Sequence, residues 1–137
     1  MLNLMGVLET SLYVQDLDRS IHFYRALFDL EELNADARFC ALNVAGRQVL
    51  LLFKQGSSGL PTQIPGGIIP PHDGSGSLHL AFSISASDLP AWGKKLQEQN
   101  ISIESRVHWP RGGQSIYFRD PDHHLIELVT PGCWSIY

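Results

Sequence analysis

The sequence predicts an α+β protein built from two pseudo-symmetric modules, each with the element order βαβββ. The segment VLETSLYVQDLDRSIHFYRALFDL, residues 7–30, has the pattern of a strand, a capped turn and an amphipathic helix. The segment SLHLAFSISASDLPAWGKKLQEQN, residues 77–100, repeats this plan. Strand-like runs separated by Gly and Asp-Pro turn signals follow each helix. The chain is therefore expected to be one domain, residues 1–137, with a duplicated architecture.

In the first module, residues 5–56, Asp16 or Asp18 is the expected N-cap of the helix. Apolar residues recur on one helical face, at Ile21, Tyr24, Leu27 and Phe28. The runs RFCALNVAG and RQVLLLFKQ read as strands, and a weaker pattern predicts another strand near residues 31–35.

A segment rich in Gly, Pro and Ser separates the modules. We assign residues 57–76 as a linker without regular structure. Its His72 and Asp73 suit either a lid over a binding site or a passive connector.

In the second module, residues 77–133, Ser87 or Asp88 is the expected helix N-cap, and Pro90 falls in the first turn. Asn100 is expected to end this helix, since Asn tolerates the left-handed conformation. The runs ISIESRVHW, QSIYFRDPD and HLIELVT read as strands.

Composition limits the classes of function. The net charge is −4 and the chain has no run of Lys or Arg, which argues against nucleic acid and membrane partners. No apolar stretch reaches the roughly 20 residues that span a bilayer, and no signal peptide is evident, so a cytoplasmic protein is expected. Cys40 and Cys133 have no metal-binding spacing and are interpreted as packing residues.

A carboxylate inside an apolar run marks the candidate site. Glu127 lies within the run LIELV, and a buried carboxylate needs a proton, an ion-pair partner or a metal. Arg111 and Arg119 are possible ion-pair partners. Strand alternation places Glu9 with Ser11 and Tyr13 on one face of the first strand, and His79 with Ala81 and Ser83 on one face of its counterpart. Small or polar side chains on these faces suit a pocket.

The duplicated plan and two motifs, VxDLxxSxxFYxxLF at residues 14–28 and YFRDPDxHxIEL at residues 117–128, resemble the vicinal oxygen chelate superfamily. This superfamily includes glyoxalase I, fosfomycin and bleomycin resistance proteins and extradiol dioxygenases. The resemblance covers essentially the whole chain. It implies that the two modules form a cup-shaped, partly closed mixed β-sheet with the helices outside.

The resemblance also implies a divalent metal held by Glu9, His79 and Glu127, with Mn, Zn, Ni, Fe and Mg all possible. Two departures from the family patterns limit the choice of reaction. A fourth ligand of glyoxalase type would fall at Leu51, which cannot coordinate a metal. The resemblance to fosfomycin transferases and extradiol dioxygenases implies a histidine at the first ligand position, where this chain has Glu9.

The resulting prediction is a small-molecule enzyme of the lyase, isomerase, transferase or dioxygenase type that chelates vicinal substrate oxygens. Glu127, Ser11, Tyr13 or Tyr117 would move the proton. The expected substrate-binding residues are Phe39, His72, Trp109 and Arg111.

The alternative is a metal-free protein that sequesters a drug or metabolite, with Phe39 and Trp109 as hydrophobic walls. A homodimer is expected from the resemblance. Closure of the modules within one chain and exchange of modules between chains are both compatible with the sequence.

Overall fold

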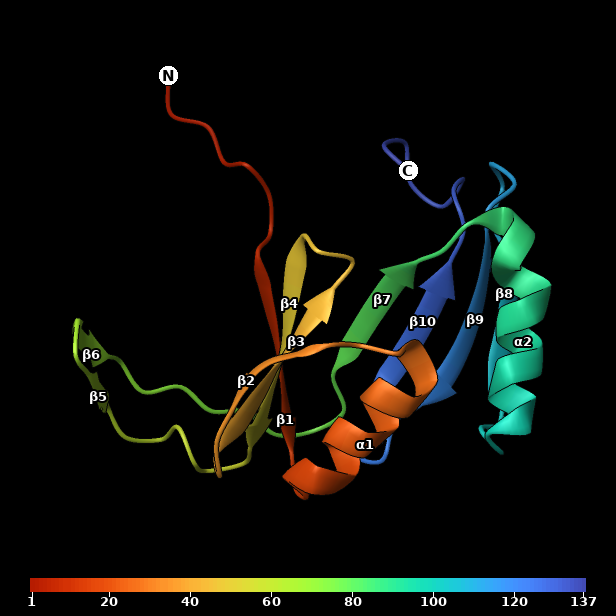
Figure 1. The fold of residues 1–137 in the computed structure, drawn as a ribbon. Coiled ribbons are helices and arrows are strands. Elements are labelled where there is room, and N and C mark those ends of the chain that lie inside the picture. The colour runs from red at the N-terminus through yellow and green to blue at the C-terminus, as the bar shows by residue number, and fades with distance from the viewer. The chain divides into compact units, whose positions relative to one another are not determined.

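The computed structural model describes residues 1–137 and divides them into two compact units, Met1–Ser75 and Gly76–Tyr137. Each unit contains one four-stranded mixed sheet and one long helix (Figure 1). The predicted α+β fold with two βαβββ-like modules is confirmed. None of the helices is both long enough and apolar enough to cross a bilayer.

The elements of module one are β1 (Glu9–Val14), α1 (Leu17–Phe28), β2 (Glu32–Ala35), β3 (Phe39–Val44) and β4 (Gln48–Lys54). Its sheet has the order β1-β4-β3-β2, in which β1 runs parallel to β4 and the other neighbours are antiparallel. The weak strand pattern near residues 31–35 therefore does form β2.

The helix of module one covers one face of this sheet and leaves the other face open. Helix α1 contacts β3 and β4 and buries Leu17, Tyr24 and Leu27. The core positions of the strands are Leu12, Val14, Cys40, Leu42, Leu50 and Leu52, all at most 1% exposed. Asp16 caps the helix, because its carboxylate accepts a hydrogen bond from the Arg19 backbone N–H at 3.0 Å.

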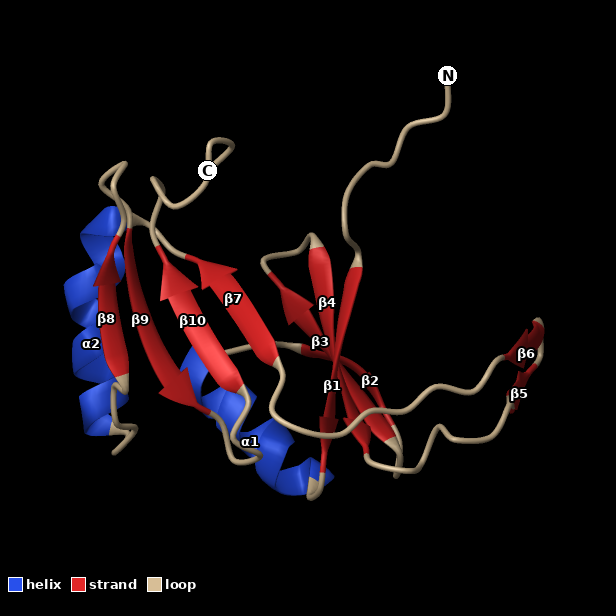
Figure 2. Ribbon diagram, turned by 180° about the vertical axis from the view of Figure 1, so that it is seen from behind, coloured by secondary structure: helices blue, strands red, loops and turns tan.

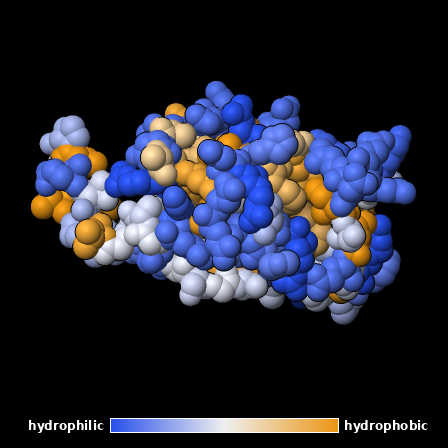
Figure 3. All heavy atoms as spheres, turned by 90° about the horizontal axis from the view of Figure 1, so that it is seen from below, coloured by the Kyte–Doolittle hydropathy of each residue, from blue (hydrophilic) through white to orange (hydrophobic).

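The connecting segment corrects one prediction. It was expected to lack regular structure, but it contains a small hairpin of β5 (Thr62–Ile64) and β6 (Gly67–Ile69). Pro65 and Gly66 form the two-residue connection between strands rich in β-branched residues, which outweigh the overall Gly and Pro content. Ile64, Ile68 and Ile69 of the hairpin are exposed, and Figure 3 shows hydrophobic groups gathered there, at its left end.

The elements of module two are β7 (His79–Ser83), a 3₁₀ turn (Ala86–Asp88), α2 (Leu89–Glu98), β8 (Ser105–His108), β9 (Gln114–Arg119) and β10 (Leu125–Val129). The sheet order β7-β10-β9-β8 repeats that of module one, with β7 parallel to β10. Helix α2 lies beside β8 in both ribbon views (Figure 2).

The boundaries of α2 agree with the sequence signals at both ends. Asp88 occupies the N-cap position, although its side chain makes no capping hydrogen bond, and Pro90 falls in the first turn. After the C-cap Gln99, Asn100 has φ +56°, and the Ile101 backbone N–H donates to the Leu96 carbonyl at 2.9 Å. This left-handed termination is the one predicted for Asn100.

The turn between β9 and β10 also follows the prediction. Pro121 and Asp122 are its central residues, because the His123 N–H donates to the Asp120 carbonyl at 3.0 Å. His123 itself is left-handed, with φ +63°. Its neighbour His124 is fully buried and accepts a hydrogen bond from the Leu78 N–H through Nδ1, at 2.8 Å. The two adjacent histidines thus have structural roles in the turn and the strand entry.

Candidate functional site

In module two, the structure brings together two of the predicted metal ligands, His79 and Glu127. They lie on the neighbouring parallel strands β7 and β10, in a register that pairs His79 with Leu125 and Ala81 with Glu127. The His79 Nε2 atom is 3.2 Å from Glu127 Oε1. The His79 side chain is 50% exposed, so the pair is accessible to a ligand.

The hydrogen bond made by the second ring nitrogen, Nδ1, shows where the imidazole of His79 carries a proton. Its Nδ1 lies 2.9 Å from the carbonyl oxygen of Leu125. A carbonyl can only accept, so Nδ1 carries the proton and donates it. The Nε2 atom then faces Glu127 with either a proton or a lone pair. Two lone pairs repel at this distance, so a proton on Nε2, a proton on the Glu127 carboxyl or a metal ion must lie between the two atoms.

The geometry of the pair fits metal binding. Two donor atoms that each lie about 2.1 Å from one ion at tetrahedral or right angles are roughly 3.0–3.4 Å apart. The separation of His79 Nε2 and Glu127 Oε1 falls in this interval. A metal-binding histidine usually donates its other N–H to a carbonyl or carboxylate, as His79 does here.

Glu127 is nearly buried, with 6% of its surface exposed, and its second oxygen is held by the neighbouring strand. Ser115 on β9 donates to Glu127 Oε2 at 2.5 Å. The Trp109 indole N–H in turn donates to Ser115 Oγ at 2.8 Å. Arg119, one of the arginines considered as a partner of Glu127, instead pairs with Glu104 at 2.7 Å. The partner of Glu127 is therefore His79.

Tyr117 lies across the strand pair from Glu127 and belongs to the same cluster. Burial and the negative charge of Glu127 raise the pKa of its phenol above the usual value. Tyr117 therefore remains protonated at neutral pH and suits the role of a hydrogen-bond donor or an acid better than that of a base. Its ring centroid is 6.3 Å from that of His79.

The sequence reasoning missed Ser115. Alternation along β9 places Ser115 and Tyr117 on one face, so the assignment of Tyr117 to the site was a usable signal for its neighbour two residues earlier. Trp109 was predicted as a substrate contact, and the structure shows its indole N–H engaged with Ser115. Arg111 is exposed in the turn that precedes β9.

In module one, the corresponding face carries a different set of side chains. Register pairs Ser11 with Leu51 in β1 and β4, as it pairs Ala81 with Glu127 in β7 and β10. Leu51 is therefore the structural counterpart of Glu127, as the sequence alignment of the two halves indicated. Glu9 is the counterpart of His79, and with Leu51 in place of a carboxylate the His79–Glu127 contact of module two is not repeated.

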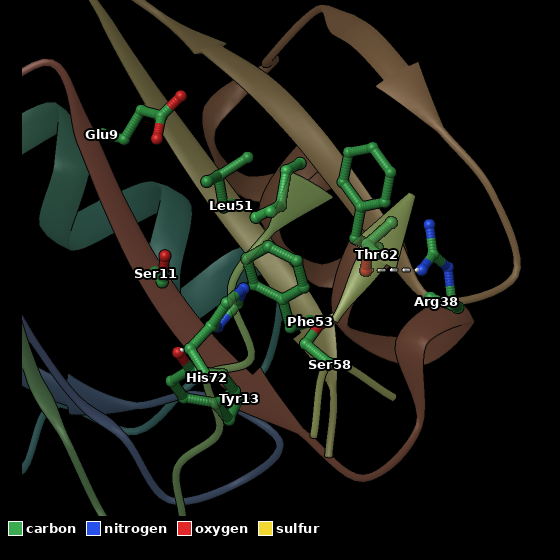
Figure 4. A pocket seen from close by; sticks show the side chains of 11 residues that line it. Glu9, Ser11, Tyr13, Arg38, Leu51, Phe53, Ser58, Thr62 and His72 are labelled. Carbon is green, nitrogen blue, oxygen red and sulfur yellow. Dashed lines mark hydrogen bonds between the residues drawn. The ribbon is translucent and has the colours of Figure 1, made fainter. Parts of the chain in front are cut away.

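A cavity of about 470 Å³ opens on this face of module one. Three predicted residues from β1, Glu9, Ser11 and Tyr13, line it. The other lining residues are Arg38, Phe39, Leu51, Phe53, Ser58, Thr62, Ile69 and His72. Figure 4 shows Glu9 and Arg38 on opposite sides of this cavity, with Leu51 and Phe53 between them. We call this cavity the aromatic pocket.

The connecting segment forms one wall of the aromatic pocket. His72 Nδ1 is 2.7 Å from the hydroxyl of Tyr13, and its ring meets Phe53 edge-on at 4.6 Å between centroids. The His72 backbone N–H donates to the Ser58 carbonyl at 2.9 Å, and Asp73 accepts from the Gly56 N–H at 3.2 Å. The connecting segment therefore lines part of this cavity, and its role as a lid over a binding site stays a prediction.

Burial and the nearby Asp73 charge raise the pKa of Tyr13, so its hydroxyl keeps its proton at neutral pH. Gly74 lies against the same ring, since a Cβ at this position would be 2.4 Å from Tyr13 Cδ2. A larger residue at position 74 would force the Tyr13 ring or the segment that carries His72 to move.

Glu9 belongs to the first unit, whereas His79 and Glu127 belong to the second. The structure contains no group of three or more His, Cys, Asp or Glu side chains arranged to hold a metal ion. The participation of Glu9 in a metal site with His79 and Glu127 therefore stays a prediction. The two residues of module two are the ones whose geometry fits.

The structure is a fold of two βαβββ modules with a histidine–carboxylate pair on adjacent parallel strands. The sequence profile of the Glyoxalase/Bleomycin resistance protein/Dioxygenase superfamily matches residues 6–128. The chain belongs to this superfamily, and the resemblance noted in the sequence is confirmed.

The chain is similar to two curated relatives named metallothiol transferase FosB. That of Bacillus licheniformis is 32% identical over 128 residues, which cover 93% of this chain and 76% of the relative. That of Staphylococcus epidermidis is 33% identical over 119 residues, covering 85% and 75%.

Among solved structures, the lactoylglutathione lyase of Agrobacterium tumefaciens is similar with a TM-score of 0.85 and 30% identity, covering 97% of this chain and 98% of that one. The fosfomycin resistance protein FosX of Listeria monocytogenes has a TM-score of 0.66 at 21% identity, covering 95% and 94%, and shows the shared fold alone.

Proposed function

We propose that this protein is a divalent-metal-dependent enzyme that transfers a thiol to a small electrophilic molecule. The observation that carries the proposal is the pair formed by His79 and Glu127, whose facing atoms are spaced as two ligands of one metal ion. The similarity to metallothiol transferases over 93% of the chain supports this reaction class.

The residues of module two have distinct roles in this proposal. His79 and Glu127 hold the metal, and Ser115 orients the carboxylate by donating to its second oxygen. The metal, when bound, supplies a Lewis acid that polarises a substrate oxygen. Glu9 is the predicted third ligand.

The reaction forms a bond between the thiol sulfur and an electrophilic carbon of the substrate and breaks a carbon–oxygen bond. Overall, the proton lost by the thiol is balanced by the proton gained by the oxygen that leaves the carbon. Tyr117 is protonated at neutral pH, and we assign it the donation of a hydrogen bond or proton to that oxygen.

Metal analysis tests this proposal directly. Protein purified without chelator is compared with the His79→Ala and Glu127→Ala variants, with His108→Ala and Glu98→Ala as matched exposed controls. We expect about one equivalent of metal in the wild type and in the controls, and loss of metal in both site variants. Glu9→Gln is expected to weaken binding. Retention of metal by both site variants would contradict the proposal.

The aromatic pocket favours a second candidate function, sequestration of a drug or metabolite without metal. The same measurements separate the two functions. Sequestration predicts no bound metal in the wild type, stoichiometric ligand binding, and no consumption of thiol. Metal-dependent consumption of a small thiol in the presence of an epoxide electrophile, lost in Glu127→Ala, supports the enzyme.

A further inference from the structure

The aromatic pocket has walls that distinguish it from a site for a small polar molecule. The rings of Tyr13 and Phe53 stack with centroids 5.9 Å apart and planes inclined by 25°. Phe39 continues the stack, 5.8 Å from Phe53 at 27°. These near-parallel rings and Leu51 give an extended apolar surface. Flat ring systems are the groups that such a surface binds best, because they cover it at little entropic cost.

Charge is distributed unevenly around this apolar surface. Glu9 and Arg38 lie on opposite sides of the aromatic pocket (Figure 4). An anionic group is repelled by the carboxylate and attracted by the guanidinium, so the electrostatics orient an anion toward Arg38. The opposite end of such a ligand then lies at Glu9, the predicted metal ligand.

Arg38 has hydrogen-bonding capacity left for a ligand. Its Nη1 donates to Thr62 Oγ1 at 3.2 Å, and its Nη2 donates to Asp36 Oδ2 at 3.2 Å. A guanidinium has five N–H donors, and the arginine side chain is 42% exposed. An ion pair this exposed with Asp36 is weak and leaves the guanidinium available for a forked contact with a carboxylate.

We propose that the aromatic pocket selects a flat, largely apolar organic anion, with its ring system on Phe53 and Tyr13 and its anionic group at Arg38. This assignment names the substrate class of the enzyme proposed above and rests on that proposal. The connecting segment contributes to the selection, because His72 and Thr62 line the same cavity. Substrate choice thus resides in module one, on residues distinct from the ligand pair of module two.

The test uses 2-naphthoate as the probe, titrated calorimetrically into the whole protein without added metal. Two comparison probes isolate its features: 2-naphthylmethanol has the rings without the charge, and hexanoate has the charge without the rings. We expect one molecule of 2-naphthoate per chain. We expect 2-naphthylmethanol to bind about tenfold more weakly, as loss of a charge-assisted hydrogen bond at a partly exposed site implies. Hexanoate should bind more weakly still.

Variants of single residues show which side chains cause these differences in affinity between the probes. Arg38→Gln should remove the preference for 2-naphthoate over 2-naphthylmethanol, whereas Arg47→Gln, an exposed arginine in the turn between β3 and β4, should leave it unchanged. Phe53→Leu keeps an apolar side chain but removes the ring, and should weaken both naphthalene probes about three- to tenfold. Circular dichroism and the urea midpoint check that each variant is folded.

Three outcomes overturn the assignment: no binding of 2-naphthoate, equal affinity for hexanoate, or an unchanged preference in Arg38→Gln. Metal content is measured separately on the same wild-type preparation. If the wild-type protein holds no metal but still binds 2-naphthoate, the metal-dependent function fails and the pocket is an anion-selective binding site. If the protein holds metal but does not bind 2-naphthoate, the assigned substrate class is wrong and the metal-dependent function stands.

Discussion

The two modules share one hydrogen-bonded framework and present different chemistry on it. In both, the first strand pairs in parallel with the last, and the next two strands follow in the same order. Leu52 of module one and Leu128 of module two occupy the same register position, and both are fully buried. The inward faces of the two sheets are therefore alike.

The open faces differ at every position that bears on function. Glu127 of module two corresponds to Leu51, and its cross-strand neighbour Tyr117 corresponds to Ala41. Ser115, which orients Glu127, corresponds to Phe39. The same scaffold thus carries the His79–Glu127 pair in one module and an aromatic cavity in the other. Outward-facing side chains differ while the buried faces stay alike, because alternate strand residues face opposite ways, and the connecting segment adds one wall of the aromatic pocket.

The largest expected effect comes from making module two resemble module one. Glu127→Leu places the residue found at the corresponding position of module one into β10. We expect metal affinity to fall more than about 100-fold, because loss of a ligand costs more than loss of a group that merely orients it. The fold should be retained, as Leu51 shows that leucine fits this register. Metal titration checks the result, with Glu98→Gln as the control; unchanged affinity would contradict the assignment.

The equivalence of the buried faces predicts equal costs in the two modules. Leu52→Ala and Leu128→Ala should each lower the free energy of unfolding by about 3 kcal/mol, since each leaves a cavity in a closed core. Leu51→Ala, on the open face, should cost clearly less. Urea denaturation measures all three. A negligible cost at Leu52 or Leu128 would show that the two cores are not equivalent.

The Ser115 hydroxyl of module two has no equivalent in module one, where Phe39 occupies the corresponding position. Ser115→Ala removes the hydrogen bond to Glu127 Oε2 and leaves the Trp109 indole N–H without its acceptor. We expect metal affinity to fall about 10- to 100-fold. Ser115→Thr keeps a hydroxyl and should restore part of the affinity, and Ser105→Ala on β8 is the exposed control. Equal losses in the Ala and Thr variants would mean that shape, and not the hydrogen bond, matters.

The helix N-termini provide a smaller contrast. Asp16 caps α1 through its side chain, whereas Asp88 at the start of α2 makes no such bond. Asp16→Ala should therefore lower the free energy of unfolding by about 1 kcal/mol, and Asp88→Ala should change it much less. Thermal or urea denaturation measures the difference. Equal costs would show that Asp88 also caps its helix in solution.

The smallest effect, when stability is measured at pH 9, is a pH dependence located in module one. Burial, with a contribution from Glu32, raises the pKa of the Cys40 thiol from 9.0 to about 11. The unfolded chain therefore loses this proton at lower pH than the folded chain, and stability falls as pH rises from about 9 to 11. At pH 9 the expected loss is roughly 0.4 kcal/mol. Cys40→Ala should flatten this part of the stability profile; an unchanged slope would contradict it.

Most of the fold follows from the sequence because its signals are local. Alternation fixed which face of β1 is open, and Asp16, Asn100 and His123 end or turn elements as their chemistry requires. The hairpin of residues 62–69 was missed, because two three-residue strands fall below the length at which alternation is recognisable.

The candidate site was predictable only in part. The family resemblance implied His79 and Glu127 as site residues, and the structure shows that parallel pairing of β7 with β10 brings them together. Ser115 and Arg38 were missed because their roles depend on partners from other strands or loops, at distances that no local pattern encodes. The tautomer of His79 likewise depends on a carbonyl 46 positions away in the chain.

The parallel strand pair has a consequence for how the chain acquires its structure during synthesis. Strand β1 has β4 as its only sheet neighbour, about 40 residues later in the chain. At 5 to 20 residues per second, translation of these residues takes roughly 2 to 8 s, during which β1 has no strand to pair with. Strand β7 waits similarly for β10, so His79 and Glu127 cannot meet before nearly all of the second sheet has been translated. Capture of a cation by this pair would then mark the moment at which the nascent sheet closes.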